Sequence, residues 1–346
     1  MSAPSAPRCR SSRIDLPGRR RETVIQLSDD ARNIRMGVIP ADGGQIATIQ
    51  YRLRNRWTEL LYRGLDYSPP PWPGWPGRAP LLWPTVGRTF LPEQVARSRK
   101  SGRMPRACQY RMGGRRYRIP IHGFARYRAW SVVNSGADTD SAWVTCAMQS
   151  SPETRLMYPF DFQLQVTHRL NKGRVVSLYE VTAGDNDEPM PFSIGNHIGF
   201  RMPLTGKGRY EDCTLRTPGT RRNEVQAGLI TAKSKRLDLS RPTPLGTGIY
   251  SDRVVTGYTS RNAWTEITDP NALTLRVSQK ERPVGGRRYL TDKDLSFVYW
   301  GQPENNQICP EPWIGWPNVL NTRKHGVLLP PNKRFRWEMT VACRTA

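Results

Sequence analysis

The sequence lacks the features that mark membrane, coiled-coil and nucleotide-binding proteins. None of its apolar runs approaches the ~18 residues that a transmembrane helix needs, so no membrane partner is expected. Its 29 Gly and 30 Pro interrupt the chain too often for long helices or a coiled coil. It contains neither G-x-G-x-x-G nor G-x-x-x-x-G-K-[ST] and has no βαβ rhythm, so nucleotide-binding folds lose support.

Metal sites and disulfide frameworks are poorly supported as well. The four His include no H-E-x-x-H or H-x-H spacing, and no two Cys form a C-x-x-C. We therefore expect no metal and no other cofactor. Two of the six Cys, Cys146 and Cys343, lie in strand-like segments and are expected to be small core residues.

Acidic residues are scarce relative to basic ones. The chain has 53 Lys plus Arg against 29 Asp plus Glu, a net charge of +24, and only nine of the basic residues are Lys. This excess suits either an anionic partner or a solvated surface whose Arg content reflects coding-DNA composition. In segment 97–128, Arg alternates with aromatic residues as in a nucleic-acid stacking groove, but no nucleic-acid-binding module is present. Nucleic acid is therefore a disfavoured partner.

Residues 1–21 are basic and rich in Pro and Ser, and they lack the apolar stretch of a secretory signal. The three Arg at 19–21 resemble a twin-Arg signal, but the segment after them is not hydrophobic enough. We expect a disordered tail here and a cytoplasmic protein.

From Thr23 onward, short apolar runs alternate with turn signals. Several runs, including Phe162–Leu170 and Arg174–Val181, alternate apolar and polar residues as strands with one buried face do. Many short strands without a convincing helical period predict an all-β fold, a large antiparallel β-sandwich or barrel. The Pro- and Trp-rich segment 69–84 is expected to be an ordered rim or lid, because three exposed Trp would reduce solubility. A polyproline ligand is the alternative.

Acid–base chemistry is indicated by two His and one Glu. His122 and His197 each end a short apolar stretch close to Gly, where active-site groups are often found. Glu311 lies between two Pro and near two Trp, which would hold its backbone and partly desolvate its carboxylate. A structural His and a Glu paired with an Arg are the alternatives. With Trp313 to stack on a sugar ring and Asn196 to bond hydroxyls, the set suits a carbohydrate.

Four blocks, in order, resemble the aldose 1-epimerase (galactose mutarotase) family. They are Leu81–Arg88 (LLWPTVGR), Ile121–Arg126 (IHGFAR), Pro191–Phe200 (PFSIGNHIGF) and Cys309–Asn321 (CPEPWIGWPNVLN). The segment Tyr158–Phe162 (YPFDF) is similar to a further family strand. The resemblance spans about residues 35 to 343. It implies a galactose mutarotase-like β-supersandwich, which we expect to occupy residues 22–346 as one domain.

The resemblance also implies roles for particular residues. His197 would be the general acid that protonates the ring oxygen, and Glu311 the general base on the anomeric hydroxyl. Arg88 and His122 would bind the sugar. Asp252 is the best match to the family's further sugar-binding Asp. The expected reaction interconverts the α and β anomers of a free hexose by opening and reclosing the ring, without a cofactor.

Two other functions fit the same resemblance. Residues 86–128 carry 12 Lys or Arg and one Glu, a net of +11, so a hexose 6-phosphate is an alternative substrate. A non-catalytic carbohydrate-binding protein on the same fold is the other alternative, because a fold alone does not determine function.

Overall fold

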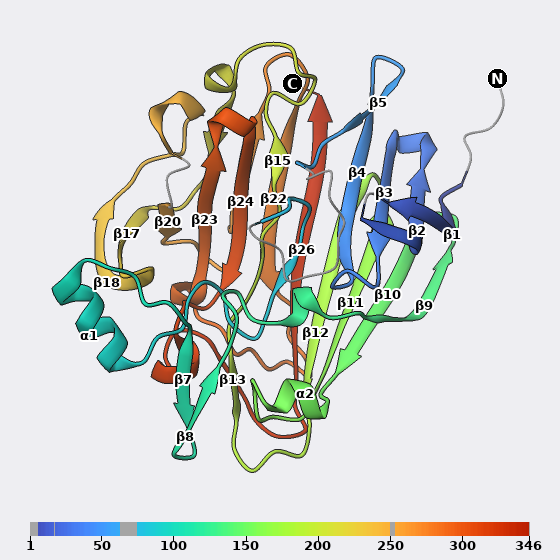
Figure 1. Cartoon of the computed structure of the whole chain (residues 1–346). Helices are drawn as coiled ribbons and strands as arrows, with labels where there is room; N and C mark the ends of the chain where they lie inside the picture. Colours follow the sequence, from blue (N-terminus) through green and yellow to red (C-terminus); the bar gives the residue numbers. More distant parts are fainter. Residues whose placement is uncertain (1–5, 17, 63–74, 250–252, 346) are drawn as a thin grey trace.

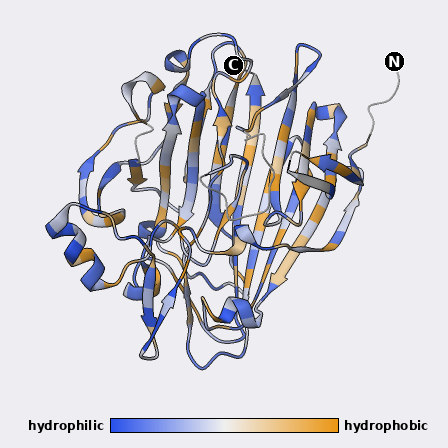
Figure 2. Ribbon diagram, viewed as in Figure 1, coloured by the Kyte–Doolittle hydropathy of each residue, from blue (hydrophilic) through white to orange (hydrophobic). Residues whose placement is uncertain are grey.

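The computed structural model describes residues 6–16, 18–62, 75–249 and 253–345. Along its central strands, buried side chains alternate with more exposed ones. In β11 (Phe162–Asn171) every second residue, from Phe162 to Leu170, is buried, and β12 (Arg174–Ala183) alternates in the same way. Figure 2 shows orange and blue alternating along these central strands. Each buried Leu or Val contributes roughly 1.5–3 kcal/mol relative to an exposed one, so these faces drive the sheets together.

Three antiparallel sheets form most of the described chain (Figure 1). The nine-stranded sheet contains, in spatial order, β19 (Thr243–Pro244), β16 (Thr214–Arg216), β21 (Trp264–Thr268), β22 (Leu273–Glu281), β26 (Arg334–Thr345), β12, β11, β10 (Ser141–Gln149) and β9 (Ser131–Ala137). The eight-stranded sheet contains β18 (Leu229–Arg236), β17 (Arg221–Gln226), β20 (Arg253–Thr256), β23 (Leu295–Gln302), β24 (Gln307–Ile314), β14 (Ile194–Asn196) and β6 (Leu81–Leu82), with β15 (Phe200–Arg201) also pairing with β24. The predicted all-β antiparallel fold is confirmed.

The third sheet is N-terminal, and the remaining elements are short. Its order is β1 (Arg8–Leu16), β2 (Arg19–Asp29), β3 (Ile34–Ile39), β4 (Gln45–Leu53) and β5 (Arg56–Glu59). Two strand pairs stand apart: β7 (Gln109–Met112) with β8 (Arg115–Arg118), and β13 (Met190–Phe192) with β25 (Val327–Leu329). The α-helices are α1 (Pro92–Ser101), α2 (Pro152–Arg155) and α3 (Val319–Thr322).

The eight- and nine-stranded sheets face each other across the core. The Tyr299 hydroxyl of β23 donates to Thr265 Oγ1 of β21 at 3.1 Å, and the Asn196 amide of β14 donates to the Tyr179 hydroxyl of β12 at 3.0 Å. Because successive side chains of a strand point to opposite faces, the neighbours of these residues on β23 and β14 lie on the outer face of the eight-stranded sheet. His197 and Glu311, two of the candidate site residues, lie on that outer face.

The expectation of disorder over residues 1–21 is wrong for residues 8–16. These residues form β1, which pairs with β2 from Arg8 opposite Ser28 to Leu16 opposite Arg19. Most β1 side chains are exposed on both faces, so the apolar alternation that reveals a strand is absent from the sequence. The strand is held instead by its backbone pairing and by contacts of the hairpin with β9 and β10.

Candidate active site

His197 and Glu311 face each other across two paired chain segments. Residues 194–195 pair with 313–314 on β24, and residues 200–201 pair with 307–308 in the same register. That register places His197 directly opposite Glu311, where side chains on one face of a sheet contact each other. The imidazole Nε2 lies 3.3 Å from Oε1 of Glu311, and both side chains are buried.

The second carboxylate oxygen of Glu311 is held by its own strand. The indole N–H of Trp313 donates to Oε2 at 3.1 Å, and residues two apart on a strand share a face. Trp313 also packs in a small apolar cluster with Leu82, Val86, Val254 and Val298. Each carboxylate oxygen of Glu311 therefore contacts a different neighbour, which fixes the direction of the carboxylate.

Aromatic rings enclose His197. Trp75 stacks on the imidazole with ring centroids 4.9 Å apart, and Trp300 meets it edge-on at 5.6 Å. Gly199 makes this possible, because a Cβ at that position would lie 2.1 Å from the Trp75 ring. Trp75 belongs to the segment expected to be an ordered rim, of which residues 69–74 lie outside the described residues. Sequence reasoning identified neither Trp75 nor Trp300 as a neighbour of His197.

The pKa of His197 is lowered to about 3, first by burial and then by the positive charge of Arg126. The imidazole is therefore neutral at pH 7. Its Nε2 faces a carboxylate oxygen, so the hydrogen is expected on Nε2. Its buried Nδ1 has no hydrogen-bond partner among the residues that the structure describes.

His122 approaches His197 from a tight turn. Their ring centroids are 5.5 Å apart. The backbone N–H of His122 donates to the Gly87 carbonyl at 2.8 Å, and the Gly87 N–H donates to His122 Nδ1 at 3.0 Å. Since Nδ1 accepts, neutral His122 carries its hydrogen on Nε2 as a donor. Burial, reinforced by Arg126 and His197, lowers the pKa of His122 well below its usual value.

Two arginines contribute positive charge near these groups. Arg126 is buried and donates to the Ile121 carbonyl at 3.4 Å and to the Tyr127 hydroxyl. Burial lowers the pKa of Arg126, and the negative charge of Glu311 partly opposes that shift. The charge of Arg88 contributes to the lowered pKa of His122, and its side chain lies against the turn at Gly228. Sequence reasoning predicted Arg88 and missed Arg126, although Arg126 ends the IHGFAR block.

Two predicted sugar-binding residues, Asn196 and Trp313, are held by hydrogen bonds within the protein. The amide of Asn196, one residue before His197, faces the opposite side of the strand and donates to the Ala79 carbonyl and the Tyr179 hydroxyl. This interior position does not support sugar binding by Asn196. The indole N–H of Trp313 is bonded to Glu311, which indicates a positioning role. Asp252 lies outside the described residues.

The described residues contain no group of three or more His, Cys, Asp or Glu placed to hold a metal ion. All six cysteines are free thiols. No described helix has the length and apolar character needed to cross a membrane.

Known proteins resemble this chain in sequence and in fold. The sequence profile of the family described as aldose 1-epimerase matches residues 95–325. The plasmid-borne protein LacX of Lactococcus lactis is 25% identical over 305 residues, which cover 86% of this chain and 89% of LacX.

Solved structures share the fold. The Slr1438 protein from Synechocystis has a TM-score of 0.72 at 21% identity, covering 97% of this chain and 99% of its own. The galactose 1-epimerase from Lactobacillus acidophilus has a TM-score of 0.68 at 14% identity, and the match covers 99% of this chain and 100% of that protein's chain. The predicted galactose mutarotase-like fold is confirmed. Because the family profile covers most of the chain, this protein belongs to the aldose 1-epimerase family, and its kind of activity is that of a sugar epimerase or mutarotase.

Proposed function

We propose that this protein interconverts the α and β anomers of a free hexose, with His197 and Glu311 as the acid–base pair. The observation that carries the proposal is the 3.3 Å contact between His197 Nε2 and Glu311 Oε1. Mutarotation acts on the ring oxygen and on the anomeric hydroxyl, which are bonded to the same carbon. An acid and a base that serve these two oxygens have to converge on one place, and these side chains do.

Ring opening transfers one proton from the anomeric hydroxyl to the ring oxygen. Glu311 accepts the hydroxyl proton while the bond from the anomeric carbon to the ring oxygen breaks, and His197 gives its Nε2 proton to that oxygen. The Glu311 carboxyl returns a proton to Nε2 across their contact as the imidazole gives its own proton up, so no imidazolate is left and both residues end unchanged. Rotation of the aldehyde and the reverse transfers close the ring on its other face. Each group is expected to contribute ~10²–10⁴-fold.

This route matches the electrostatics of the pair. It uses a neutral imidazole and a carboxylate, and a pKa of about 3 keeps His197 neutral at pH 7. Attraction between Arg126 and Glu311 favours the carboxylate form that accepts a proton. The Nε2–H of His122 and the guanidinium of Arg88 are the donors that we assign to sugar hydroxyls.

Polarimetry of a pure anomer tests the proposal. The wild-type protein should equilibrate α-D-glucose or α-D-galactose faster than buffer, and Glu311→Gln should lose ~10²-fold or more of that rate. Glu304→Gln, an exposed position on another segment, is the matched control and should retain it. If wild type and His197→Ala both equilibrate a broad panel of aldoses at the rate of buffer, the proposed enzymatic function is wrong. Tight sugar binding without turnover would then favour the non-catalytic alternative.

A phosphorylated hexose is a second candidate substrate. Arg88 has no ion-pair partner among the described side chains, it belongs to the strongly basic segment 86–128, and its charge acts on His122. A guanidinium suits a phosphate. Glucose and glucose 6-phosphate should be compared in the same assay with wild type and Arg88→Gln. Equal kcat/KM for both sugars in wild type would eliminate this candidate.

A further inference from the structure

A groove of about 1110 Å³ lies where the N-terminal sheet meets the other two. Its walls are the β4–β5 hairpin, the segment 201–208 that begins in β15, and the turn between β21 and β22 at residues 271–272. Residues Leu61 and Phe200 form a β-bridge, which joins the chain just after β5 to β15. The groove is therefore bounded by elements from all three sheets.

Five cationic residues line this groove: Arg52, Arg54, Arg56, Arg201 and Lys207. We call it the basic groove. None of the five has an ion-pair partner among the described residues. The acidic residue in the lining is Glu59, whose Oε1 accepts the backbone N–H groups of Ile49 and Leu61 at 3.0 and 3.2 Å. A hollow lined by several unneutralised charges of one sign concentrates the electric field and attracts anions.

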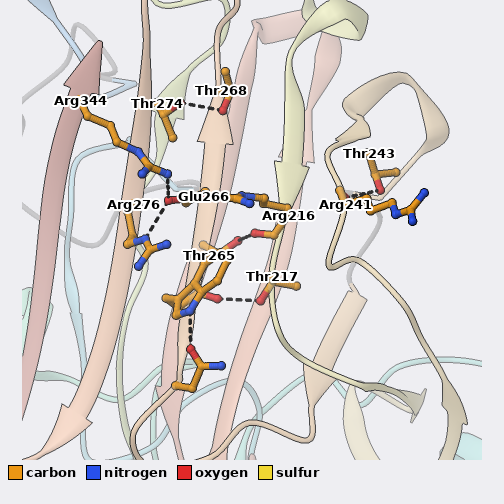
Figure 3. Close-up of polar contacts among 12 residues, drawn as sticks. Arg216, Thr217, Arg241, Thr243, Thr265, Glu266, Thr268, Thr274, Arg276 and Arg344 are labelled. Atoms are coloured by element: carbon orange, nitrogen blue, oxygen red, sulfur yellow. Dashed lines mark hydrogen bonds and ion pairs between the residues drawn. The ribbon is translucent and has the colours of Figure 1, made fainter. Parts of the chain in front are cut away.

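Some of the other arginines on the protein are paired with carboxylates. On the outer face of the nine-stranded sheet, the buried carboxylate of Glu266 is surrounded by Arg216, Arg276 and Arg344 (Figure 3). Glu180 and Glu338 on the same sheet each pair with two cations. The basic groove differs from these paired clusters, because its five cations have no ion-pair partner among the described residues.

The basic groove continues the face that carries the candidate active site. Arg201 pairs in register with Gln307 on β24, and Glu311 follows four residues further along the same strand. At ~3.3 Å per residue the backbones of these two positions are ~13 Å apart. Trp300, opposite Cys309, and Trp75 lie on the stretch between the two places. Aromatic rings of this kind are suited to stack against sugar rings.

We propose that the basic groove binds an anionic group on an oligosaccharide whose reducing end lies at His197 and Glu311. The group is a sugar-borne carboxylate, sulfate or phosphate, one or more rings away from the reacting anomeric carbon. Arg201 is the groove cation nearest to His197 and Glu311 along the strand, and Arg56 and Lys207 line the same groove from the hairpin and from the loop after β15. The inference rests on the proposed function for the location of the reducing end.

Calorimetric titration of three trisaccharides at low ionic strength tests the inference. The probes are neutral maltotriose, trigalacturonate, and maltotriose phosphorylated or sulfated on its non-reducing ring. Wild type should bind the anionic probes at least about tenfold more tightly than maltotriose, as charge-assisted hydrogen bonds suggest. The relative affinities of the anionic probes identify the preferred group. Arg56→Gln/Arg201→Gln/Lys207→Gln should lose this preference and retain the rate of glucose interconversion.

A control variant of equal charge change separates a local site from the overall charge. Arg241→Gln/Arg261→Gln/Lys293→Gln removes three exposed cations outside the groove and should keep the preference. If wild type shows no preference, or the control loses it equally, the inference is wrong. The interconversion of glucose anomers is measured separately. If wild type does not catalyse it, the proposed function is wrong. If wild type catalyses it but shows no preference for the anionic probes, only the inference of anion binding in the basic groove is wrong.

Discussion

The indole N–H of Trp313 donates to Oε2 of Glu311 at 3.1 Å, leaving Oε1 directed at His197 Nε2. The proposed base is thus oriented by a residue of its own strand. A carboxylate that is already directed at the reacting atoms does not need to reorganise during the reaction.

Trp313→Phe should therefore reduce kcat without removing any reacting group. A hydrogen bond to a charged group contributes ~1.5–3 kcal/mol, so a decrease of ~10- to 100-fold is expected. Trp316→Phe is the matched control, because the buried Nε1 of Trp316 has no hydrogen-bond partner among the described residues. Anomer equilibration measured by polarimetry gives both rates. Equal rates for the two variants would exclude the positioning role.

The pH dependence of the reaction should show no histidine titration near neutrality. Burial and Arg126 hold the pKa of His197 at about 3, so the imidazole is neutral on both sides of pH 6.5. We expect kcat/KM to stay level between pH 6 and pH 8. Rates with a pure anomer, corrected for the buffer reaction, test this. A fall in kcat/KM as pH rises through 6.5 would show that the reacting form is an imidazolium.

Removing the positive charge of Arg126 should raise the pKa of His197. After burial, the repulsion between this guanidinium and a protonated imidazole is the next cause of the lowered value. In an NMR titration of the imidazole, Arg126→Gln should therefore show a higher pKa than wild type. Arg126→Lys retains the charge and should show a smaller change. An unchanged pKa in Arg126→Gln would mean that burial alone keeps His197 neutral.

His168 should make the folded protein less stable in acid. Its ring is buried between the Ser177 hydroxyl and the Gly44 carbonyl, both at 2.8 Å, and burial lowers its pKa from 6.5 to about 4. Between these values the unfolded chain binds a proton that the folded chain does not. The free energy of unfolding therefore falls as pH drops from 6.5 towards 4, by up to ~3 kcal/mol from this group.

Urea unfolding at pH 7 and pH 4.5 measures this contribution. His168→Gln should be less stable than wild type at pH 7, because the buried ring packing is lost. It should lose less free energy of unfolding than wild type between the two pH values. An identical loss in both proteins would show that other buried groups determine the acid sensitivity.

Periodicity and motifs predicted much of the fold, and they failed where their physical basis was missing. Buried alternation is clear in the sequence of β11, and the structure has a strand there. β1 has few buried side chains and depends on backbone pairing, which leaves no pattern in the sequence. A short motif also does not show which face each residue occupies. Asn196 and His197 are adjacent in one block, yet their side chains point to opposite sides of the sheet.

The surroundings of the candidate site were the least predictable part. The motifs indicated His197 and Glu311, and the strand register brings them into contact. Trp75 and Trp300 reach His197 from distant segments, so only tertiary structure reveals them. Arg126 is inside a recognised block, but its buried charge acts on His122, His197 and Glu311 together, and no local pattern indicates that effect.

A double-mutant comparison tests most directly whether His197 and Glu311 act as one proton-transferring unit. Equilibration rates of pure α-D-glucose or α-D-galactose would be measured for wild type, His197→Gln, Glu311→Gln and the double variant. Groups that act as a unit are strongly non-additive, so the double variant should be about as slow as the slower single variant. Losses that multiply in the double variant, or a wild-type rate equal to that of buffer, would contradict this account.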